Sequence, residues 1–296
     1  MFYNLMQSYT DKIKKCICEK YDSEVLKYKA IEDIYATIDL HHHTIHSDGL
    51  SNVQEIIAYM IERGITVGAI TDHDGTGGVE EGLKLAQEKG IICFSGVEFS
   101  TRTKEDAEIH ILGYEIDIDN PGIQKLCQKA MDGRTRKNEE RLNIVLKKWP
   151  DLNEQVAKLR SSEYVGKPHI ARMLLTEKKI ETLQEAFEGI LAGTPLLENP
   201  VIETSVEEAC KIIIEAGGVP IWAHPGITKE FATRETPEFW KVCAEHMELF
   251  KSYGVRGVEC LHKKHSINEA LTLVDMALNK DLIITRGSDY HGRYYL

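Results

Sequence analysis

Histidine, aspartate and glutamate residues occur in short groups along most of the 296-residue chain. His41 and His43 stand two residues apart just after an apolar segment, and Asp289 and His291 repeat this spacing near the other end. Side chains at positions i and i+2 of a strand point to the same side, so each pair could reach one metal ion. Imidazole and carboxylate ligands together suit Zn, Mn or Fe.

Further groups of the same residue types follow other strand-like segments. They are Thr71-Asp72-His73-Asp74, Gly96-Val97-Glu98, His110, His224 and Glu259, while Asp48 belongs to the first group, with His41 and His43. We expect every group to lie where a parallel strand ends, because sites in parallel sheets and barrels are built at that edge. A single histidine is usually structural, and a single aspartate is usually a helix cap. Burying so many titratable groups without a metal would be costly, so the set predicts a metal site.

Composition limits the class of protein. The chain is 42% hydrophobic and 28% charged, which is ordinary for a globular protein. No apolar run reaches the roughly 18 residues that would span a bilayer, and the first residues do not resemble a signal peptide. The seven cysteines form no CxxC pair, which favours free thiols in a reducing compartment. We therefore expect a cytoplasmic protein that does not bind membranes.

The formal net charge of −11 limits the partners. Tight binding to long duplex DNA depends on Lys and Arg that neutralise phosphates, so it is disfavoured. A small phosphorylated substrate, such as a nucleotide or a short RNA, is compatible with this net charge, because metal ions can supply positive charge locally.

Strand-like and helix-like segments alternate on both sides of a polar helical stretch, which predicts an α/β protein with a parallel sheet or barrel. Strands are expected at 35–40, 66–71, 91–100, 108–116, 219–224, 255–261 and 282–287. We divide the chain into a helical N-terminal extension (1–35), a barrel (36–119 and 201–296) and a helical insertion that caps the substrate site (120–200).

Taken as an ordered set, the motifs resemble those of the PHP family, named for polymerase and histidinol phosphatase. The matching segments are DLHHHT, TDHD, GVE, HILGY, AHPG and GSDYHG, within residues 36–118 and 203–292. The resemblance implies a distorted (β/α)7 TIM-like barrel. It also implies two or three divalent metal ions, with Mn²⁺ favoured and Zn²⁺ or Fe²⁺ as alternatives.

The resemblance further implies nine metal ligands. His41, His43, Glu98 and Asp289 would hold one ion; Glu98, His110 and His224 a second; and Asp48, His73 and His291 a third. Nine ligands exceed the coordination number of a single ion, which independently favours several metals. We expect a hydroxide that bridges the metals to attack a phosphate ester, with Glu98 as a catalytic ligand.

Other residues near the motifs receive supporting roles. We expect Asp72 to support a ligand, Asp74 to cap the next helix, and His265 to orient the substrate or protonate the leaving oxygen. His42 and His46 are not expected to bind metal.

The expected insertion contains Gly166-Lys167-Pro168-His169-Ile170-Ala171-Arg172. This stretch resembles one in the PHP branch that holds phosphatases of nucleoside 3',5'-bisphosphates and exoribonuclease AM. It implies that Lys167, His169 and Arg172, with Arg134 on an earlier helix, bind a second phosphate. The competing interpretation is a solvated, charged helix face.

A phosphatase acting on such bisphosphates is the leading hypothesis. A phosphodiesterase acting on short RNA 5' ends or on a small cyclic phosphate is the main alternative. Histidinol phosphate and amide substrates are disfavoured by the motifs. A non-catalytic, metal-stabilised module is disfavoured because all nine ligand positions are filled.

Overall fold

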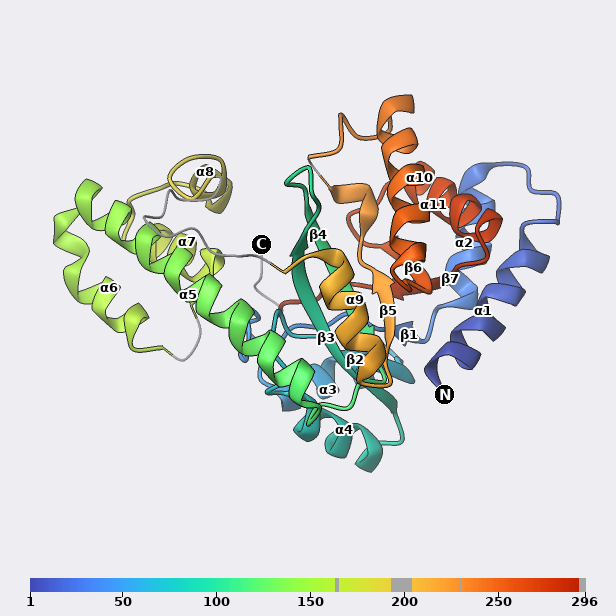
Figure 1. Cartoon of the computed structure of the whole chain (residues 1–296), viewed down its shortest axis with the longest axis horizontal. Helices are drawn as coiled ribbons and strands as arrows, with labels where there is room; N and C mark the ends of the chain where they lie inside the picture. The colour runs from blue at the N-terminus through green and yellow to red at the C-terminus, as the bar shows by residue number, and fades with distance from the viewer. Residues whose placement is uncertain (163–164, 193–203, 229, 293–296) are drawn as a thin grey trace.

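Seven strands form one sheet whose spatial order follows the chain (Figure 1). The computed structural model describes residues 1–162, 165–192, 204–228 and 230–292. The strands are β1 (Ile38–Asp39), β2 (Val67–Ile70), β3 (Ile92–Arg102), β4 (Glu108–Tyr114), β5 (Val219–Trp222), β6 (Gly257–His262) and β7 (Ile283–Gly287).

The sheet curves until its first and last strands meet. Leu40 N–H donates to the carbonyl of Arg286 at 3.0 Å, and Tyr290 N–H donates to the carbonyl of His41 at 3.1 Å. The result is a nearly closed seven-stranded barrel within an α/β fold, which confirms the predicted TIM-like architecture.

One strand runs against our expectation. β4 was expected to be parallel, but it is antiparallel to both β3 and β5. The connection from β3 to β4 is only residues 103–107, whereas a parallel crossover needs about a dozen residues or more. The hairpin places Glu98 opposite Leu112 and Ser100 opposite His110, so Glu98 and His110 are diagonal neighbours on one face.

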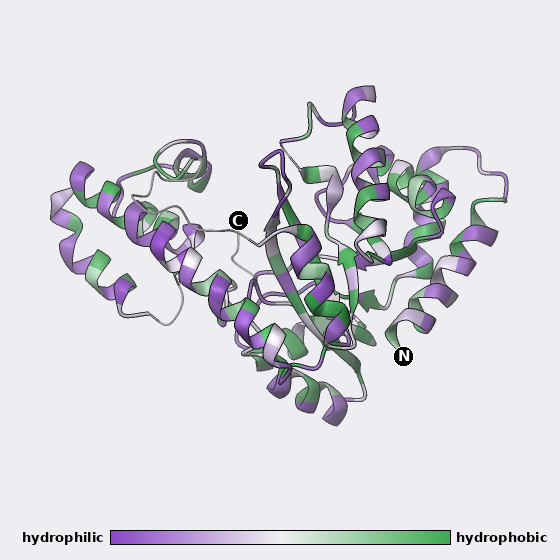
Figure 2. Cartoon of the chain, in the orientation of Figure 1, coloured by the Kyte–Doolittle hydropathy of each residue, from purple (hydrophilic) through white to green (hydrophobic). Residues whose placement is uncertain are grey.

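Amphipathic helices cover the outside of the barrel. In α3 (Val53–Glu62) the buried residues Val53, Ile56, Ile57 and Met60 follow the helical repeat, and Asn52 caps the helix with a capping box. The other helices of this layer are α4 (Val79–Glu88), α9 (Val206–Glu215), α10 (Pro237–Ser252) and α11 (Ile267–Asn279). Figure 2 shows their polar faces outward. Among the described residues, no helix has the length and apolar character that crossing a membrane requires.

The first 35 residues form two helices that belong to the barrel's hydrophobic core. α1 (Phe2–Cys16) and α2 (Glu24–Ile34) lie beside β7 and α11 (Figure 1). Phe2 is fully buried and stacks on Tyr114 with 4.5 Å between ring centroids. Thr10 Oγ1 accepts a hydrogen bond from Ile284 N–H at 2.9 Å. The helical prediction for this segment is correct, and the helices complete the packing around β7.

The described part of the segment after β4 consists of helices joined by short turns, and it extends away from the barrel (Figure 1). It consists of α5 (Pro121–Lys148), the 3-10 turn η1 (Pro150–Leu152), α6 (Asn153–Arg160), α7 (Lys167–Thr176) and α8 (Leu183–Glu188). Leu142, Val145, Val156 and Leu174 belong to a separate core. The division into domains stays a prediction, and its boundary at 200/201 lies outside the described residues.

Candidate metal centre

Glu98 lies at the centre of the histidine groups. It is fully buried within β3, and five imidazoles approach its carboxylate. The nitrogens are His41 Nε2 (3.2 Å), His43 Nε2 (3.2 Å) and His73 Nδ1 (3.0 Å) around Oε2, and His110 Nδ1 (2.9 Å) and His224 Nε2 (2.9 Å) around Oε1. One carboxylate therefore links five imidazoles that four different segments supply.

The first predicted ligand group is assembled in full. The ligand atoms of His41, His43, Glu98 and Asp289 all lie within 4.8 Å of one another. His41 Nε2 and His43 Nε2 face each other at 3.1 Å. That separation suits two nitrogens that share one ion at about 2.1 Å each.

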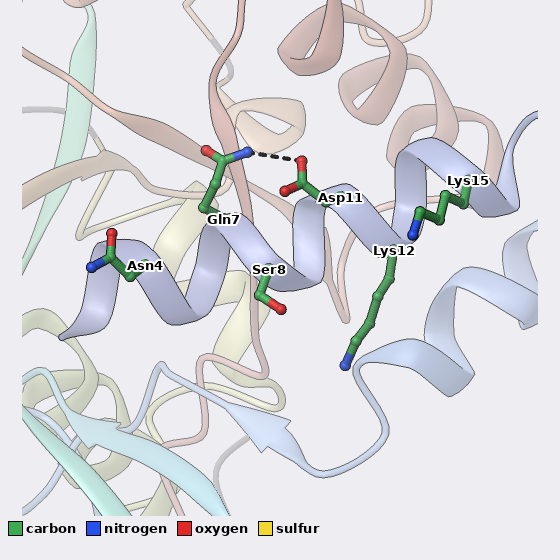
Figure 3. A pocket seen from close by; sticks show the side chains of 6 residues that line it. All are labelled: Asn4, Gln7, Ser8, Asp11, Lys12 and Lys15. Carbon is green, nitrogen blue, oxygen red and sulfur yellow. Dashed lines mark hydrogen bonds between the residues drawn. The ribbon is translucent and has the colours of Figure 1, made fainter.

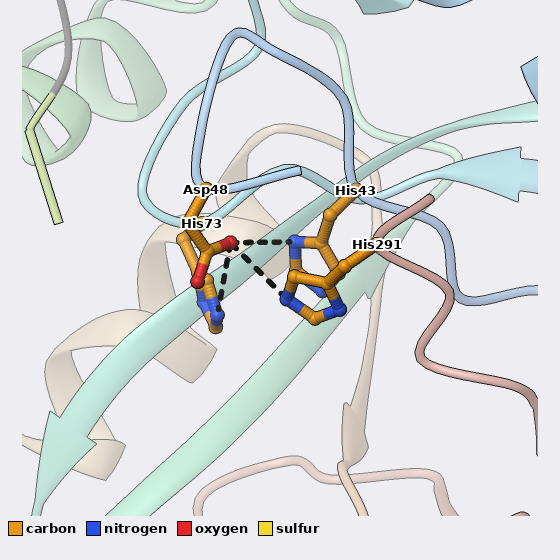
Figure 4. Close-up of side chains that lie close together, drawn as sticks. All are labelled: His43, Asp48, His73 and His291. Atoms are coloured by element: carbon orange, nitrogen blue, oxygen red, sulfur yellow. Dashed lines mark ion pairs between the residues drawn. The ribbon is translucent and has the colours of Figure 1, made fainter. Parts of the chain in front are cut away.

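The predicted third group gains a member. Asp48 Oδ1 lies 3.1 Å from His291 Nε2 and 3.9 Å from His73 Nε2. His43 joins them through Nδ1, 4.0 Å from the same oxygen (Figure 4). The two nitrogens of His43 thus face different groups of ligands, one on each side of the ring.

The second predicted group does not lie at the ends of parallel strands, as we had expected. His110 and His224 both contact Glu98 Oε1, but His110 and Glu98 lie within β4 and β3. Their positions follow from the antiparallel hairpin, so the expectation that every group ends a parallel strand is wrong. The ligand atoms of His73 also lie close to those of Glu98 and His110.

Asp289 and His291 lie beyond β7, and their shared orientation does not come from an extended strand. Asp289 has a φ of +50°, which is unusual for a residue other than glycine. His291 Nδ1 donates to the carbonyl of Asp289 at 2.9 Å. A tight turn, and not the strand alternation that we expected, brings the two side chains to the centre.

Glu259 in β6 contacts two predicted ligands; the sequence interpretation counted it among the groups of the site but not among the nine ligands. Its Oε1 lies 3.0 Å from His41 Nδ1, and its Oε2 accepts the backbone N–H of His224 at 3.1 Å. Gly287 makes room for this contact, because a Cβ there would lie 2.1 Å from Glu259 Oε1. A charged residue inside an otherwise apolar strand was the available signal.

Two aspartates beside His73 have different tasks. Asp72 accepts hydrogen bonds from Thr44 N–H and Thr44 Oγ1, each at 2.7 Å, and from Ser47 Oγ. It therefore supports the loop that carries Asp48, as expected. Asp74 does not cap a helix; its carboxylate accepts from Ser100 N–H at 2.8 Å and from Arg134.

The charges at the centre depend on one another. Burial raises the pKa of Glu98, but the imidazoles of His41, His73 and His110 outweigh burial and hold that pKa well below its usual range. Burial lowers the pKa of His43 and His110, yet neighbouring carboxylates raise these values to about 9 and about 10. A metal ion would displace these protons, so metal binding should release protons and weaken as the pH falls.

The donor set fits divalent metal ions. Glu98 Oε2 is buried and close to three imidazole nitrogens, but none of them meets hydrogen-bond geometry, and His73 Nδ1 has no hydrogen bond either. Buried polar groups without hydrogen bonds are unfavourable unless something else satisfies them. Cations among these nitrogens and oxygens would do so. The assignment of individual ligands stays a prediction.

His265 is held by the backbone through one of its ring nitrogens. Its Nδ1 donates to the carbonyl of Cys260 at 2.9 Å, which leaves Nε2 of the neutral ring as an acceptor. Burial, together with the charge of His262, lowers the pKa of His265 to about 4. With Nδ1 bonded in this way, Nε2 of the neutral ring is an acceptor, and the expected role as an acid stays a prediction. The role in orienting the substrate stays a prediction.

Positively charged side chains gather beside His110, and we call Arg102, Arg134, Lys137, Arg141 and Lys167 the basic cluster. Burial and the charges of three of its arginines lower the pKa of Lys137 to about 8. A hydrogen bond with His110, and the charges of Arg102 and Lys167, hold the pKa of Glu108 well below its usual range despite burial. The sequence interpretation assigned phosphate binding to Arg134 and Lys167 but not to Arg102, Lys137 or Arg141.

Helix α7 brings a histidine toward the metal ligands. His169 Nδ1 accepts the N–H of Gly166 at 3.1 Å, so the proton of the neutral ring is on Nε2. Burial and the charge of Arg172 lower the pKa of His169, and the carboxylate of Asp48 opposes this effect. His169 and Arg172 therefore lie in the electrostatic environment of the metal centre, whereas Arg134 is held on the barrel by Asp74 and Ser100.

A hollow on α1 does not bring together side chains from several elements, as the metal centre does. Figure 3 shows that its six lining residues, from Asn4 to Lys15, all come from one helix, with Gln7 bonded to Asp11 at 3.1 Å. Catalytic sites bring together groups from several elements, so the chemistry belongs to the histidine-rich centre.

Comparisons with known proteins agree with this centre. The family model for the PHP domain matches residues 39–260. The 3',5'-nucleoside bisphosphate phosphatase of Chromobacterium violaceum is 28% identical over 86% of this chain and 87% of its own. The 5'-3' exoribonuclease Rnm of Salmonella typhimurium is 29% identical over 87% of this chain and 86% of its own.

Two further matches extend the range of activities. The phosphoribosyl 1,2-cyclic phosphate 1,2-diphosphodiesterase of Eggerthella lenta is 23% identical over 86% of this chain and 94% of its own. A crystal structure from Bifidobacterium adolescentis, described as that of a metal-dependent phosphoesterase, superposes with a TM-score of 0.73. It is 26% identical in sequence, and the match covers 87% of this chain and 88% of that one.

Proposed function

The chain belongs to the PHP domain family and is a metal-dependent phosphoesterase, and we propose that it removes one phosphate from a nucleotide that carries a second. A nucleoside 3',5'-bisphosphate is the substrate that we favour. The observation that carries this proposal is the basic cluster beside His110. It offers a second phosphate a binding site next to the metal centre.

We propose that the nine predicted ligands hold two or three divalent ions, with Mn²⁺ favoured over Zn²⁺ and Fe²⁺. When bound at such a site, divalent ions lower the pKa of a coordinated water toward neutrality and neutralise charge on phosphoryl oxygens. No nucleophilic serine or cysteine is then required.

The protein's own groups orient this centre. Glu98 contacts one histidine from each of the three proposed groups, namely His41, His224 and His73, so a change at Glu98 should affect the whole centre. Glu259 accepts from His41 Nδ1, so that Nε2 of the neutral ring would be the nitrogen available to a cation. Asp72 fixes the loop that presents Asp48.

The basic cluster would bind the phosphate that is not cleaved. Glu108 lies among these cations, and Asp74 and Asp106 pair with Arg134 and Arg102, so the five cations outnumber these three carboxylates in a chain whose net charge is −11. Arginine forks bind phosphate oxygens in pairs. His169 could add a hydrogen bond from Nε2–H, and Arg172 a further positive charge.

Two phosphodiester substrates remain as alternatives because they would also place an extra phosphate near the cluster. One is the 5' end of a short RNA, suggested by the exoribonuclease relatives. The other is a small cyclic phosphate on a phosphoribosyl group, suggested by the relative from Eggerthella lenta.

A substrate screen with the Mn²⁺-loaded protein tests these assignments. Adenosine 3',5'-bisphosphate, the two adenosine monophosphates, a 5'-phosphorylated short RNA, a cyclic phosphate and p-nitrophenyl phosphate would be compared by kcat/KM. We expect the bisphosphate to be hydrolysed with the highest kcat/KM. A higher value for the RNA or the cyclic phosphate would identify a phosphodiesterase instead.

Variants separate the two parts of the site. Glu98→Gln should abolish metal-dependent hydrolysis of every ester. Lys137→Met should raise KM for the bisphosphate and leave KM for p-nitrophenyl phosphate nearly unchanged. Lys147→Met, an exposed lysine on the same helix, is the matched control. Normal metal content without metal-dependent hydrolysis of any monoester or diester would refute the enzymatic assignment.

A further inference from the structure

The loop after β6 holds the turn that carries two metal ligands. We propose that Lys263 is a positioning residue that fixes Asp289 and His291 for metal binding, an inference that rests on the metal centre of the proposed function. Lys263 Nζ donates to the backbone carbonyl of Asp289 at 2.8 Å.

Lys263 acts where backbone pairing between β6 and β7 stops. The ladder of these strands ends at the pair His262–Gly287. Lys263 directly follows the last residue of β6, and Asp289 lies two residues beyond the end of β7. The ammonium group therefore continues the link between the two strand ends by a side chain.

The opposite edge of the turn is held by backbone bonds to the segment after β1. Tyr290 N–H donates to the carbonyl of His41 at 3.1 Å, and His43 N–H donates to the carbonyl of Tyr290 at 2.8 Å. Lys263 supplies a contact on the β6 side. The turn is thus held from both neighbouring strands, and both of its ligands face the centre.

The turn needs this support because its backbone is strained. Asp289 has a φ of +50°, and residues with a Cβ pay an energetic penalty in the left-handed region unless their surroundings hold them there. The carbonyl that Lys263 contacts also accepts His291 Nδ1–H at 2.9 Å. That bond places the proton on Nδ1 and directs His291 Nε2 toward Asp48, 3.1 Å away.

Lys264, the next residue, makes a different contact with the same aspartate. Its Nζ lies 3.2 Å from Asp289 Oδ2, while Oδ1 faces His43 at 3.3 Å. Lys264 is about half exposed, with 52% of its side chain accessible. It contributes charge near the carboxylate but does not contact the backbone of the turn, so it is a natural control for Lys263.

Charge and positioning predict opposite signs. Removing a cation near a metal site reduces electrostatic repulsion and should tighten metal binding. Removing a group that orients a ligand typically weakens metal binding by about 10- to 100-fold. A loss of affinity in Lys263→Met would therefore report positioning and not charge.

The experiment measures Mn²⁺ binding to the chelator-treated full chain by isothermal titration calorimetry, without substrate. We expect Lys263→Met to weaken binding by about tenfold. Lys263→Arg, which restores a donor, should recover most of the affinity. Lys264→Met should bind Mn²⁺ as tightly as the unmodified protein or more tightly. Thermal unfolding of each chelator-treated variant checks that the fold is intact, and Lys263→Gln replaces Lys263→Met if that variant does not fold.

Equal or tighter binding by Lys263→Met would overturn the inference, and so would equal losses in Lys263→Met and Lys264→Met. The readout does not depend on catalysis. If the protein binds Mn²⁺ but hydrolyses no ester, the proposed function fails while the role of Lys263 can still be decided. If the unmodified protein binds no divalent ion, both fail.

Discussion

Replacing Glu259 with glutamine tests whether a carboxylate outside the predicted ligand set controls the metal centre. Both of its oxygens face N–H donors: His41 Nδ1–H at 3.0 Å and His224 N–H at 3.1 Å. Glutamine has nearly the same shape but only one acceptor oxygen. Its NH₂ group would face one of the two donors, and either His41 or the backbone of His224 would lose its partner.

The expected loss of Mn²⁺ affinity follows from the loss of one of these two hydrogen bonds. A hydrogen bond to a charged group contributes about 1.5–3 kcal/mol. If the loss fell wholly on the metal-bound state, affinity would fall by about 10- to 150-fold. The metal-free state loses part of the same bond, because the charges of His41 and Glu259 already stabilise each other there. We therefore expect Mn²⁺ affinity to fall by about tenfold, the lower end of this range.

Competition with a chelator of known affinity measures this change. Glu215→Gln is the matched control, because Glu215 is exposed and pairs only loosely with Lys211, at 3.8 Å. At limiting Mn²⁺, kcat/KM of Glu259→Gln should fall in parallel with metal occupancy and recover in part at saturating Mn²⁺. A folded Glu259→Gln protein whose Mn²⁺ affinity matches that of Glu215→Gln would refute the reasoning.

Three further predictions concern charge and packing. KM for a 3',5'-bisphosphate should rise as the pH passes about 8, because Lys137 is expected to lose its proton there. Lys137→Arg should remove this rise, because a guanidinium does not titrate in that range. Initial rates measured at several pH values and substrate concentrations would give the KM values. In chelator-treated protein, the raised pKa values of His43 and His110 stabilise the folded state. This contribution is fully present below about pH 6.5 and is lost as the pH rises through about 9 and 10. Urea unfolding should therefore show a lower free energy of unfolding at pH 10 than at pH 6.5. Phe2→Ala should reduce the free energy of unfolding by about 3 kcal/mol, because Phe2 is fully buried against Phe94 and Tyr114; an unchanged urea midpoint would contradict this.

The sequence predicted the members of the metal centre better than the reasons for their positions. The set of His, Asp and Glu motifs is specific, and the structure brings all nine predicted ligands together. The direction of β4 was missed because alternating apolar residues look the same in parallel and antiparallel strands. The short gap between the expected strands 91–100 and 108–116 was the physical signal that could have corrected this, because a parallel crossover needs about a dozen residues or more.

The supporting residues were harder to predict because they depend on contacts between distant segments. Glu259 is 218 residues from His41 in the sequence, and no local pattern joins them. Lys137 and Arg141 look like charges on a solvated helix until α5 is packed against the barrel. Burial then distinguishes them, since it lowers the pKa of Lys137 to about 8 and that of Arg141 to about 10.

The distribution of charge explains how an acidic chain can be suited to an acidic substrate. The carboxylates of Glu98, Asp48 and Asp289 are buried against imidazoles, where they attract cations and do not face solvent. The basic cluster gathers around Glu108, at the edge of the same centre. A substrate phosphate would therefore meet local positive charge from the metals and the cluster, although the net charge of the whole chain is −11. Net charge describes solubility and long-range attraction, whereas the buried pairing of each carboxylate decides which ions the centre accepts.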